Sequence, residues 1–489
     1  MSERLPSIAI VGGGMAAWMT AAALANAFKG RGHITVAEIP QPAAAALGEA
    51  AIPTIRGFNA LLGIAEDDFI RDAGAVFSLG TEFRGWAGAD SAFFHPYGQI
   101  GTGIGSVGFH HCWFRLRKLG LADALGEYSL AAVAASLGRF ARPATDASSV
   151  LSSYSYGFHF DTAKYTAMMR ACALARGVTV KPCKTVDAVL RGEDGFIDHL
   201  VLDKRERLQG DLYVDCSGAF GALIERALRT GFEDWSHWLP CNRAVVCDSA
   251  GGTTPMTQIV ARDGGWQWRI AMQHRTSHGL VYCSHFTDDW AARNALLGQI
   301  GAPPAAEPVL AQFTNGRRKM FWNKNCVAIG EAAGFLEPLE STSVHLVLGG
   351  IARLLQFLPI DHFDPAAADE YNRLTTAEFE GIRDFLVLHY CANNAGSSPF
   401  WEYCRAMSMP DSLAYKIEMF RSRGRVPLHA EEVFYLPAWL SVLVGMGIEP
   451  RRYHPFADGI ELEMLKKQTR LIRTVVHQAA ESLPRAGLS

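Results

Sequence analysis

The sequence has little charge: Asp, Glu, Lys and Arg make up only 19% of its 489 residues, and the 46 basic side chains nearly balance the 49 acidic ones. No five consecutive residues carry charge of one sign, so a surface that binds nucleic acid through clustered Lys and Arg has no support. Apolar residues make up 49% of the chain, which excludes intrinsic disorder as the main state. At roughly 150 residues per domain, the length predicts about three domains, or two with insertions.

Metal-binding and hydrolase motifs are also missing. The ten cysteines include no Cys-x-x-Cys pair, which favours free thiols in a reducing compartment over disulfides or a zinc site. The chain contains no G-x-S-x-G, H-E-x-x-H or phosphate-loop motif. We expect His110, His111 and Cys112 to lie on a strand, where adjacent side chains point to opposite faces, so at most one histidine faces a given site. The sequence therefore predicts no metal site.

One uncharged run, residues 7–28, has the length of a membrane span. Three glycines at 12–14 interrupt it, and the pattern instead predicts a strand at 7–11, a tight turn and an Ala-rich helix at 15–28. A second short β-branched strand, from residue 33 to Glu38, completes a βαβ unit. We therefore expect no membrane segment and, because no secretory signal is recognisable, a cytoplasmic protein.

The rest of the chain indicates an α/β fold. We expect further strands at 199–203, 211–215, 280–286 and 326–329, and helices at 161–176, 343–357 and 368–395. Residues 1–395 are expected to form a nucleotide-binding, Rossmann-like region with a mixed β-sheet. Residues 396–489 are expected to form a mainly helical segment.

The glycine cluster after the first strand fits the dinucleotide-binding pattern G-x-G-x-x-A. Gly12 permits the tight turn, Gly14 lets the backbone approach a pyrophosphate, and Ala17 lets the helix pack closely on the strand. Ala16 lies at the helix N-terminus, which stabilises the anion. Glu38, at the end of the second strand, is placed to accept hydrogen bonds from a ribose diol. The alternative is a glycine-rich turn with no ligand.

Two later segments favour FAD over NAD, because they are similar to the additional FAD contacts of flavoprotein oxygenases. The first is the strand and small-residue turn at 213–218, and the second is the segment at 326–334, which contains Gly330 and Glu331. Such enzymes hold the ribityl chain of the flavin against a helix start like the second segment, although many carry Asp at the position of Glu331. Val186 resembles a strand position whose backbone faces adenine, and an ordinary buried valine is the alternative.

Four motifs resemble those of one family, the FAD-dependent tryptophan halogenases. Residues 12–18 (GGGMAAW) are close to the family's GGGTAGW, and residues 48–53 (GEAAIP) are close to its GEATIP strap over the flavin. Residues 266–270 (WQWRI) follow its W-x-W-x-I-P motif, with Ala271 in place of the final proline. Residues 335–342 (FLEPLEST) match throughout. The similarity covers most of the chain and is weakest after about residue 400.

The resemblance implies a two-lobed α/β flavoprotein of the monooxygenase type. A separate flavin reductase delivers reduced FAD, oxygen makes the C4a-hydroperoxide, and chloride or bromide attacks it to give hypohalous acid. The acid then passes along a tunnel to an electron-rich aromatic ring. A homodimer is a further expectation from the family.

The resemblance also assigns residues to the reaction. Glu340 is the carboxylate that stabilises positive charge on the ring and helps remove its proton. Thr342 and Ser343 match the positions whose backbone N–H groups hold halide at a helix start, although the family usually has Gly at the second. The matching cofactor-binding positions are Gly12, Gly14, Ala16, Ala17, Glu38, Glu49, Ala50, Val186, Gly330, Glu331 and Val344.

Aromatic residues are expected on the substrate side. Trp266 and Trp268 point to one face of a strand and would form a wall that keeps organic molecules from the flavin, and the alternative is a pair of core tryptophans. His95 and Tyr97 match positions that the family places against the indole plane, and a structural histidine is the alternative. Free tryptophan is not implied, because the residues that clamp its amino and carboxyl groups cannot be aligned.

One position departs from the family. Its catalytic lysine lies about 25 residues after the strap, in a segment like A-x-F-K, and the corresponding residue here is Ser78. The only lysine among the first 117 residues is Lys29, inside the βαβ unit. A neutral hydroxyl is a weaker donor than an ammonium group. Losing one charge-assisted donor costs about 3 kcal/mol, or roughly a hundredfold in rate.

Three hypotheses therefore stay open. The first is a halogenase for an activated ring, in which Ser78 and another donor such as His95 suffice. The second is a flavin monooxygenase that needs no halide. The third is a protein that binds reduced flavin or an indole without turnover.

Overall fold

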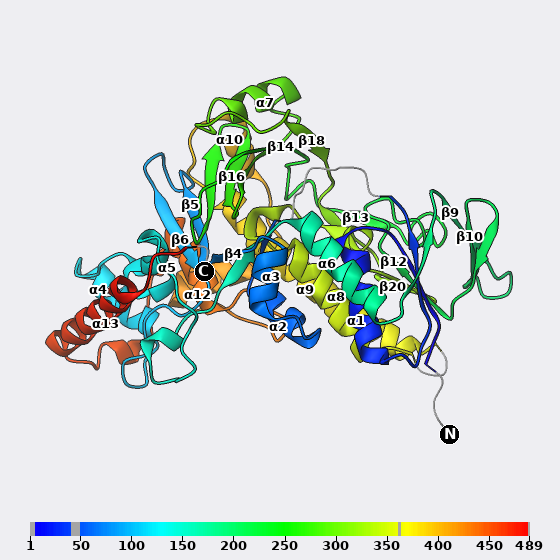
Figure 1. Ribbon diagram of the computed structural model, residues 1–489. Coiled ribbons are helices and arrows are strands. Elements are labelled where there is room, and N and C mark those ends of the chain that lie inside the picture. The colour runs from blue at the N-terminus through cyan, green and yellow to red at the C-terminus, as the bar shows by residue number, and fades with distance from the viewer. Residues whose placement is uncertain (1–4, 41–48, 360–362, 488–489) are drawn as a thin grey trace. The chain divides into compact units, whose positions relative to one another are not determined.

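The computed structural model describes residues 5–40, 49–359 and 363–487 (Figure 1). The chain forms two compact units, each built from three separate segments. The first unit comprises Met1–Ala75, Phe160–Asn242 and Ala311–Glu380, and the second comprises Val76–His159, Arg243–Leu310 and Gly381–Ser489. The helices after residue 395 are thus one part of the second unit, and a functional division at 395 stays a prediction.

The first unit is organised around a six-stranded sheet with the order β20-β21-β12-β1-β2-β8. Its central strand, β1 (Ile8–Val11), is parallel to β12 (Leu212–Asp215) on one side and to β2 (Ile34–Glu38) on the other. All four residues of β1 are buried, as expected for a parallel strand that helices cover on both faces. Helix α1 (Met15–Phe28) connects β1 to β2, so the predicted βαβ unit is confirmed.

Shorter elements complete the first unit. Its other strands are β3 (Ala50–Ala51), β8 (Thr179–Pro182), β9 (Val186–Leu190), β10 (Ile197–Leu202), β11 (Glu206–Leu208), β13 (Phe232–Asp234), β19 (Gly316–Arg318), β20 (Trp322–Asn323), β21 (Cys326–Ala328) and β22 (Gly334–Phe335). Its helices are α2 (Thr54–Leu61), α3 (Glu66–Asp72), α6 (Thr162–Ala175), α8 (Ser343–Gln356) and the short 3₁₀ helices η3 (Gly330–Ala332) and η4 (Pro338–Glu340). Helix α1 packs against α6 and α8.

The second unit is built on a seven-stranded sheet with the order β18-β14-β17-β16-β15-β5-β6. These strands are β5 (Gly80–Arg84), β6 (Ala92–Pro96), β14 (Arg243–Ala250), β15 (Thr257–Arg262), β16 (Gly265–Ala271), β17 (Arg275–Tyr282) and β18 (Val309–Gln312). Strands β4 (Val76–Ser78) and β7 (Gly157–His159) pair antiparallel. The helices are α4 (Phe109–Lys118), α5 (Leu130–Ser136), α7 (Asp289–Leu297), α10 (Pro399–Ala406), α11 (Asp411–Arg423), α12 (Leu436–Gly445) and α13 (Leu462–Ser482), with 3₁₀ helices at Leu125–Tyr128, Val150–Ser152 and Pro455–Ala457. Helix α9 (Pro365–Cys391) contributes to both units.

Two local predictions were wrong. The strand expected at 280–286 is β17, which ends at Tyr282, because the carbonyl of Cys283 accepts hydrogen bonds from the N–H groups of Phe286 and Thr287 and forms a turn. His110 and His111 lie on helix α4 rather than on a strand, and their ring centroids are 4.0 Å apart. Three basic residues in the last turn of α4 complement the helix dipole and favour the helix.

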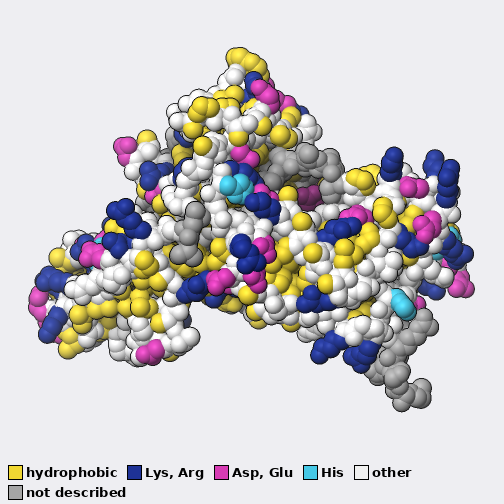
Figure 2. Space-filling model, in the orientation of Figure 1, with side chains coloured by type: hydrophobic (Ala, Val, Ile, Leu, Met, Phe, Trp, Pro, Cys, Tyr) yellow, Lys and Arg dark blue, Asp and Glu magenta, His cyan; other side chains and the backbone are white. Residues whose placement is uncertain are grey.

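The described residues contain no three His, Cys, Asp or Glu side chains arranged to hold a metal ion. They also contain no helix with the length and hydropathy of a membrane span. On the face that Figure 2 presents, Lys and Arg side chains occur in small groups among acidic and uncharged residues.

Candidate functional site

The glycine turn after β1 has no room for side chains. Gly12 has a φ of +145°, and a Cβ there would lie 2.3 Å from the carbonyl oxygen of Cys216, just beyond β12. A Cβ on Gly13 would lie 2.2 Å from the carbonyl oxygen of Ile39, just beyond β2. The turn is therefore held between the carboxyl ends of the two strands next to β1, where open α/β sheets bind their ligands.

The N-terminus of α1 is suited to an anion. Gly14 is its N-cap residue, no side chain of the described residues caps it, and the first turn carries no acidic residue. Ala17 is fully buried. The Cβ of Ala16 lies 2.7 Å from the place where a Cβ on Gly330 would lie, and Gly330 has a φ of +73°. The first glycine motif and the segment around Gly330 thus meet, as the FAD interpretation requires.

Glu38 ends β2, and its carboxylate accepts two hydrogen bonds from Arg170 of α6, with Nε 3.0 Å and a terminal nitrogen 3.2 Å away. The Arg170 guanidinium also lies 5.1 Å from the ring centroid of Trp18. Sequence reasoning missed Arg170, because its partner is 132 positions away. A carboxylate has about four acceptor sites, so Glu38 keeps acceptor capacity for a ribose hydroxyl.

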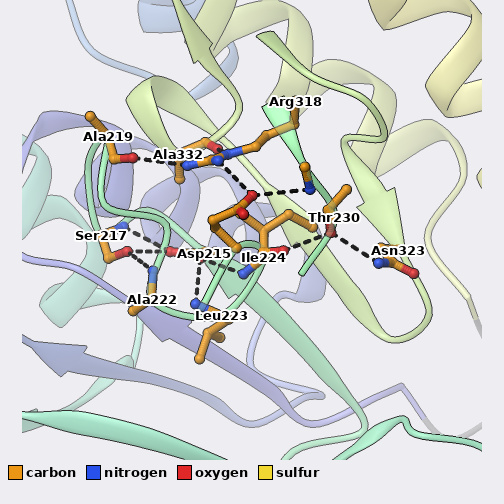
Figure 3. A network of polar contacts seen from close by, with 12 residues as sticks. Asp215, Ser217, Ala219, Ala222, Leu223, Ile224, Thr230, Arg318, Asn323 and Ala332 are labelled. Carbon is orange, nitrogen blue, oxygen red and sulfur yellow. Dashed lines mark hydrogen bonds and ion pairs between the residues drawn. The ribbon is translucent and has the colours of Figure 1, made fainter. Parts of the chain in front are cut away.

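A saturated network holds the turn after β12 (Figure 3). The Asp215 carboxylate is fully buried and accepts four hydrogen bonds: from the backbone N–H and hydroxyl of Ser217 at 3.0 and 2.6 Å, and from the N–H groups of Leu223 and Ile224 at 2.7 and 2.8 Å. With its acceptors used, Asp215 shapes the loop and has no capacity left for a ligand.

Arg318 ties that loop to the segment around Gly330 (Figure 3). Its Nε donates to the carbonyl of Ala332 at 3.0 Å, one terminal nitrogen donates to the carbonyl of Ala219 at 2.8 Å, and the other to Glu225 at 2.7 Å. Glu331 next to this junction has an exposed side chain, yet loss of hydration against the surrounding protein raises the pKa of its carboxyl. Arg318 joins the two segments that sequence similarity assigns to FAD.

The strap motif at residues 48–53 belongs to the same unit. Glu49 and Ala50 are buried, and the carbonyl of Glu49 accepts from the N–H of Phe160 at 2.9 Å. Gly48 lies outside the described residues. Thr54, which follows the motif, has its hydroxyl 3.1 Å from Nδ1 of His345 on α8.

A buried ion-pair network continues from His345. Its Nε2 lies 3.1 Å from one oxygen of Glu378, and Arg353 lies 2.8 Å from the other. Burial opposes ionisation of Glu378, but His345 and Arg353 hold its pKa below the usual value. The network thereby fixes α8 against α9 and against the start of α2.

Glu340 lies at the end of η4, with a side chain that is 1% exposed. The next residue, Ser341, has a left-handed backbone with a φ of +58°, which is uncommon for a residue with a Cβ. Asn315 braces the turn: its side-chain oxygen accepts from the N–H of Glu337 at 2.8 Å, and its amide donates to the Glu337 carboxylate at 3.3 Å. The turn is thus rigid and delivers Glu340 directly before α8.

Thr342 and Ser343 begin α8. Thr342 is the N-cap residue, and its side chain makes no capping hydrogen bond. The hydroxyl oxygens of both residues are buried, and neither has a hydrogen-bond partner among the described residues. A buried hydroxyl without a partner is costly, so its donor capacity calls for a ligand. Hydroxyl donors and the dipole of a 14-residue helix together favour a small anion. The next residue, Val344, is fully buried.

In the second unit, Trp266 and Trp268 lie on one face of β16, with ring centroids 6.0 Å apart. The indole N–H of Trp266 donates to the hydroxyl of Tyr390 at 2.9 Å, and that of Trp268 donates to Ser277 at 3.3 Å. Gly279 is opposite Trp268, and a Cβ there would lie 2.1 Å from the indole ring. The pair is rigidly packed, and its role as a wall stays a prediction.

His95 and Tyr97 lie together, as expected, with ring centroids 6.0 Å apart. The ring of His95 also lies 5.7 Å from Phe385 and 5.9 Å from Phe434. Phe385 and Phe434 stack at 3.9 Å. Sequence reasoning missed these two phenylalanines, because both are far from His95 in the sequence and no local pattern pairs them with it.

Comparison with known proteins shows what these parts belong to. The family described as "Tryptophan halogenase" matches residues 7–461. The chain belongs to the tryptophan halogenase family.

Individual halogenases match over nearly their full length. The tryptophan 6-halogenase ThaL of Streptomyces albogriseolus is 31% identical over 93% of this chain and 92% of its own. The solved structure of BrvH, a flavin-dependent halogenase from Brevundimonas sp. BAL3, is 39% identical and has a TM-score of 0.95, covering 99% of this chain and 98% of that one. A flavin-dependent halogenase from Xanthomonas campestris is 37% identical, also with a TM-score of 0.95, over 99% of this chain and 97% of its own.

Ser78 and Val186 are both buried in this halogenase. Ser78 ends β4 with a side chain that is 1% exposed, and its hydroxyl donates to the carbonyl of Gly80 over a long 3.4 Å. Val186 begins β9, is buried and pairs with Leu202 of β10. Contact of Val186 with adenine stays a prediction.

Proposed function

We propose that this halogenase-family protein binds reduced FAD in its first unit and transfers halogen from hypohalous acid to an electron-rich aromatic ring such as indole. When bound, reduced FAD supplies the two electrons with which oxygen and halide yield hypohalous acid and water. A separate flavin reductase supplies the reduced FAD. Four features of the first unit fit this cofactor. They are the glycine turn at Gly12, the uncapped N-terminus of α1, the acceptor Glu38 and the loops joined by Arg318.

The observation that carries the proposal is the sequence of groups at the start of α8. Buried Glu340 comes two residues before Thr342 and three before Ser343, whose hydroxyls are buried without partners among the described residues. These hydroxyls and the helix dipole are suited to halide. The Glu340 carboxylate is suited to a ring that becomes positively charged and must lose a proton.

Aromatic recognition is assigned to the second unit. The rings of His95, Tyr97, Phe385 and Phe434 form a cluster with edge-to-face and stacked contacts. The ring centroid of Trp439 lies 4.9 Å from that of Phe385 and 4.4 Å from Nζ of Lys416. Lys416 is neutralised by Glu432, whose carboxylate oxygen is 2.5 Å from Nζ. The cluster therefore favours an uncharged planar ring over a free amino acid.

The test is to incubate the purified protein with chemically reduced FAD, oxygen, bromide and indole, and to identify products by mass spectrometry. We expect bromoindole. Hydroxylated indole without bromoindole would favour a monooxygenase, and hydrogen peroxide as the only product would leave a flavin-binding protein without turnover.

Glu340→Gln is the matched variant, because it keeps the size of the side chain and removes its charge. We expect bromoindole formation to fall at least a hundredfold, while hypobromous acid still forms and is captured by monochlorodimedone. Unchanged bromoindole formation would show that Glu340 has no part in the reaction.

A further inference from the structure

A row of polar side chains crosses one face of the seven-stranded sheet in the second unit. The pairing register places His95 of β6 opposite Thr81 of β5, and Thr81 opposite Thr257 of β15. Directly paired residues point to the same face of a sheet, so the three side chains share a face. Their exposed fractions are 3, 0 and 2%. Trp268 points to this face too, because it pairs with Ile259, two residues beyond Thr257.

His159 of β7 closes the row at Thr257. Its Nδ1 lies 3.0 Å from the carbonyl oxygen of Ala271, and its Nε2 lies 2.9 Å from the hydroxyl of Thr257. A carbonyl oxygen only accepts, so Nδ1 carries the hydrogen and Nε2 accepts from Thr257. Burial lowers the pKa of His159 to about 4, so the ring is neutral near pH 7. The hydroxyl hydrogen of Thr257 is therefore used in the hydrogen bond to His159 and is not available to another group.

The hydroxyl of Thr81, unlike that of Thr257, has no hydrogen-bond partner among the described residues. Its oxygen is fully buried. It lies between His95 on one side and Thr257 on the other. Native proteins rarely leave such a group without a partner. A small molecule that both accepts and donates a hydrogen bond would satisfy it.

Ser78 belongs to the same neighbourhood. It is three residues before Thr81, and it pairs with Gly157 of β7. Val76 pairs with His159, so Ser78 and His159 point to the same face of the β4–β7 pair. The position at which the family carries its lysine thus shares a strand-pair face with the histidine that ends the polar row.

We infer that the Thr81 hydroxyl, three residues after Ser78, binds hypohalous acid and donates a hydrogen bond to its oxygen in place of the lysine that this chain lacks. This inference rests on the proposed function. In the transfer step a carbon–halogen bond forms and the halogen–oxygen bond breaks. Its electron pair goes to oxygen, which leaves as water after taking up the equivalent of the ring proton. A donor aimed at that oxygen stabilises the charge that develops there.

The test compares Thr81→Val with Thr276→Val. Valine keeps the shape of threonine and removes the hydroxyl. Thr276 of β17 is a matched control, because its hydroxyl is also buried without a partner among the described residues. Its neighbour Ser277 accepts from Trp268, so Thr276 points to the opposite face of the sheet.

We expect Thr81→Val to form bromoindole at least tenfold more slowly than the wild type. Hypobromous acid captured by monochlorodimedone should rise correspondingly, with consumption of reduced FAD unchanged. Thr276→Val should keep the wild-type partition between the two products. An unchanged partition in Thr81→Val would overturn the inference, whereas a wild type that forms no hypobromous acid would overturn the proposed function itself.

Thermal unfolding supplies a readout that does not depend on turnover. Removing an unpartnered hydroxyl relieves a desolvation penalty, so both variants should keep or raise Tm. A fall in Tm for Thr81→Val that Thr276→Val does not share would show that the Thr81 hydroxyl is already hydrogen-bonded, and would also overturn the inference.

Discussion

Position 78, where the motifs of the family predict a lysine, is a serine that is 1% exposed. The difference matters chemically, because a charge-assisted hydrogen bond is roughly twice as strong as a neutral one. In the proposed reaction, a weaker donor at this position slows the step in which charge develops, because a donor that acts only there changes the rate and not the binding of substrate.

Ser78→Lys should therefore raise the rate of bromoindole formation, by roughly a hundredfold if the ammonium group supplies a donor worth about 3 kcal/mol. The buried charge should at the same time lower Tm. Product formation and thermal unfolding measure the two effects. Ser78→Met is the control, because it adds a similar length without charge and should show no gain in rate. Equal activity of the two variants would mean that this chain does not use the family's lysine chemistry.

The proposed halide site lies at the start of a single element, helix α8. Thr342→Val removes one buried hydroxyl and leaves the helix dipole in place. We expect the KM for bromide to rise about tenfold, which corresponds to the roughly 1.4 kcal/mol that one lost hydrogen bond contributes. The Kd for FAD should stay unchanged. Steady-state kinetics at varied bromide and fluorescence titration with FAD distinguish the two, and an equal loss of both affinities would assign Thr342 a general structural role.

His159 of strand β7 is expected to make the free energy of unfolding depend on pH. Burial lowers the pKa of His159 to about 4 in the folded protein, while an unfolded histidine titrates near 6.5. Between these values the unfolded chain binds more protons, so the free energy of unfolding falls as pH decreases from about 6.5 toward 4. His159→Gln should make this fall shallower in urea unfolding at pH 7.5 and pH 5. Thr257→Val, which keeps the histidine, should retain most of the slope; identical slopes in the wild type and His159→Gln would contradict a neutral buried ring.

Elements with one dominant local sequence pattern could be predicted from the sequence. Contacts between residues far apart in the sequence could not. Helix α1 has the predicted bounds, because an Ala-rich run directly follows a glycine turn. Contiguous motifs likewise located the turn before α8. Arg170 and Arg318 were missed, since each acts through groups about a hundred or more positions away, at Glu38 and Ala219. No periodicity records such pairings, and only the fold brings them together.

At the scale of the whole molecule, the alternation of segments along the chain decides which of them fold together. The sequence pattern predicts a domain boundary near residue 395. In the structure, each compact unit is built from three segments that alternate along the chain. The second unit needs the segment after Gly381, since α12 packs against β6 and α13 packs against α5. The fully buried Trp401 and Trp439 also lie in this segment.

A chain ending at residue 395 should therefore fail to fold its second unit, because residues 76–159 and 243–310 would lose the helices that bury them. Large aromatic side chains dominate the energetics of a core, so their loss exposes apolar surface and favours aggregation. We expect rapid amide hydrogen exchange in these two segments, binding of a hydrophobic dye, and no cooperative unfolding transition from them, with the full chain as control. Slow exchange in both segments of the shortened chain would show that residues 396–489 form an independent domain, and the linear division would then describe folding better than the interleaved units do.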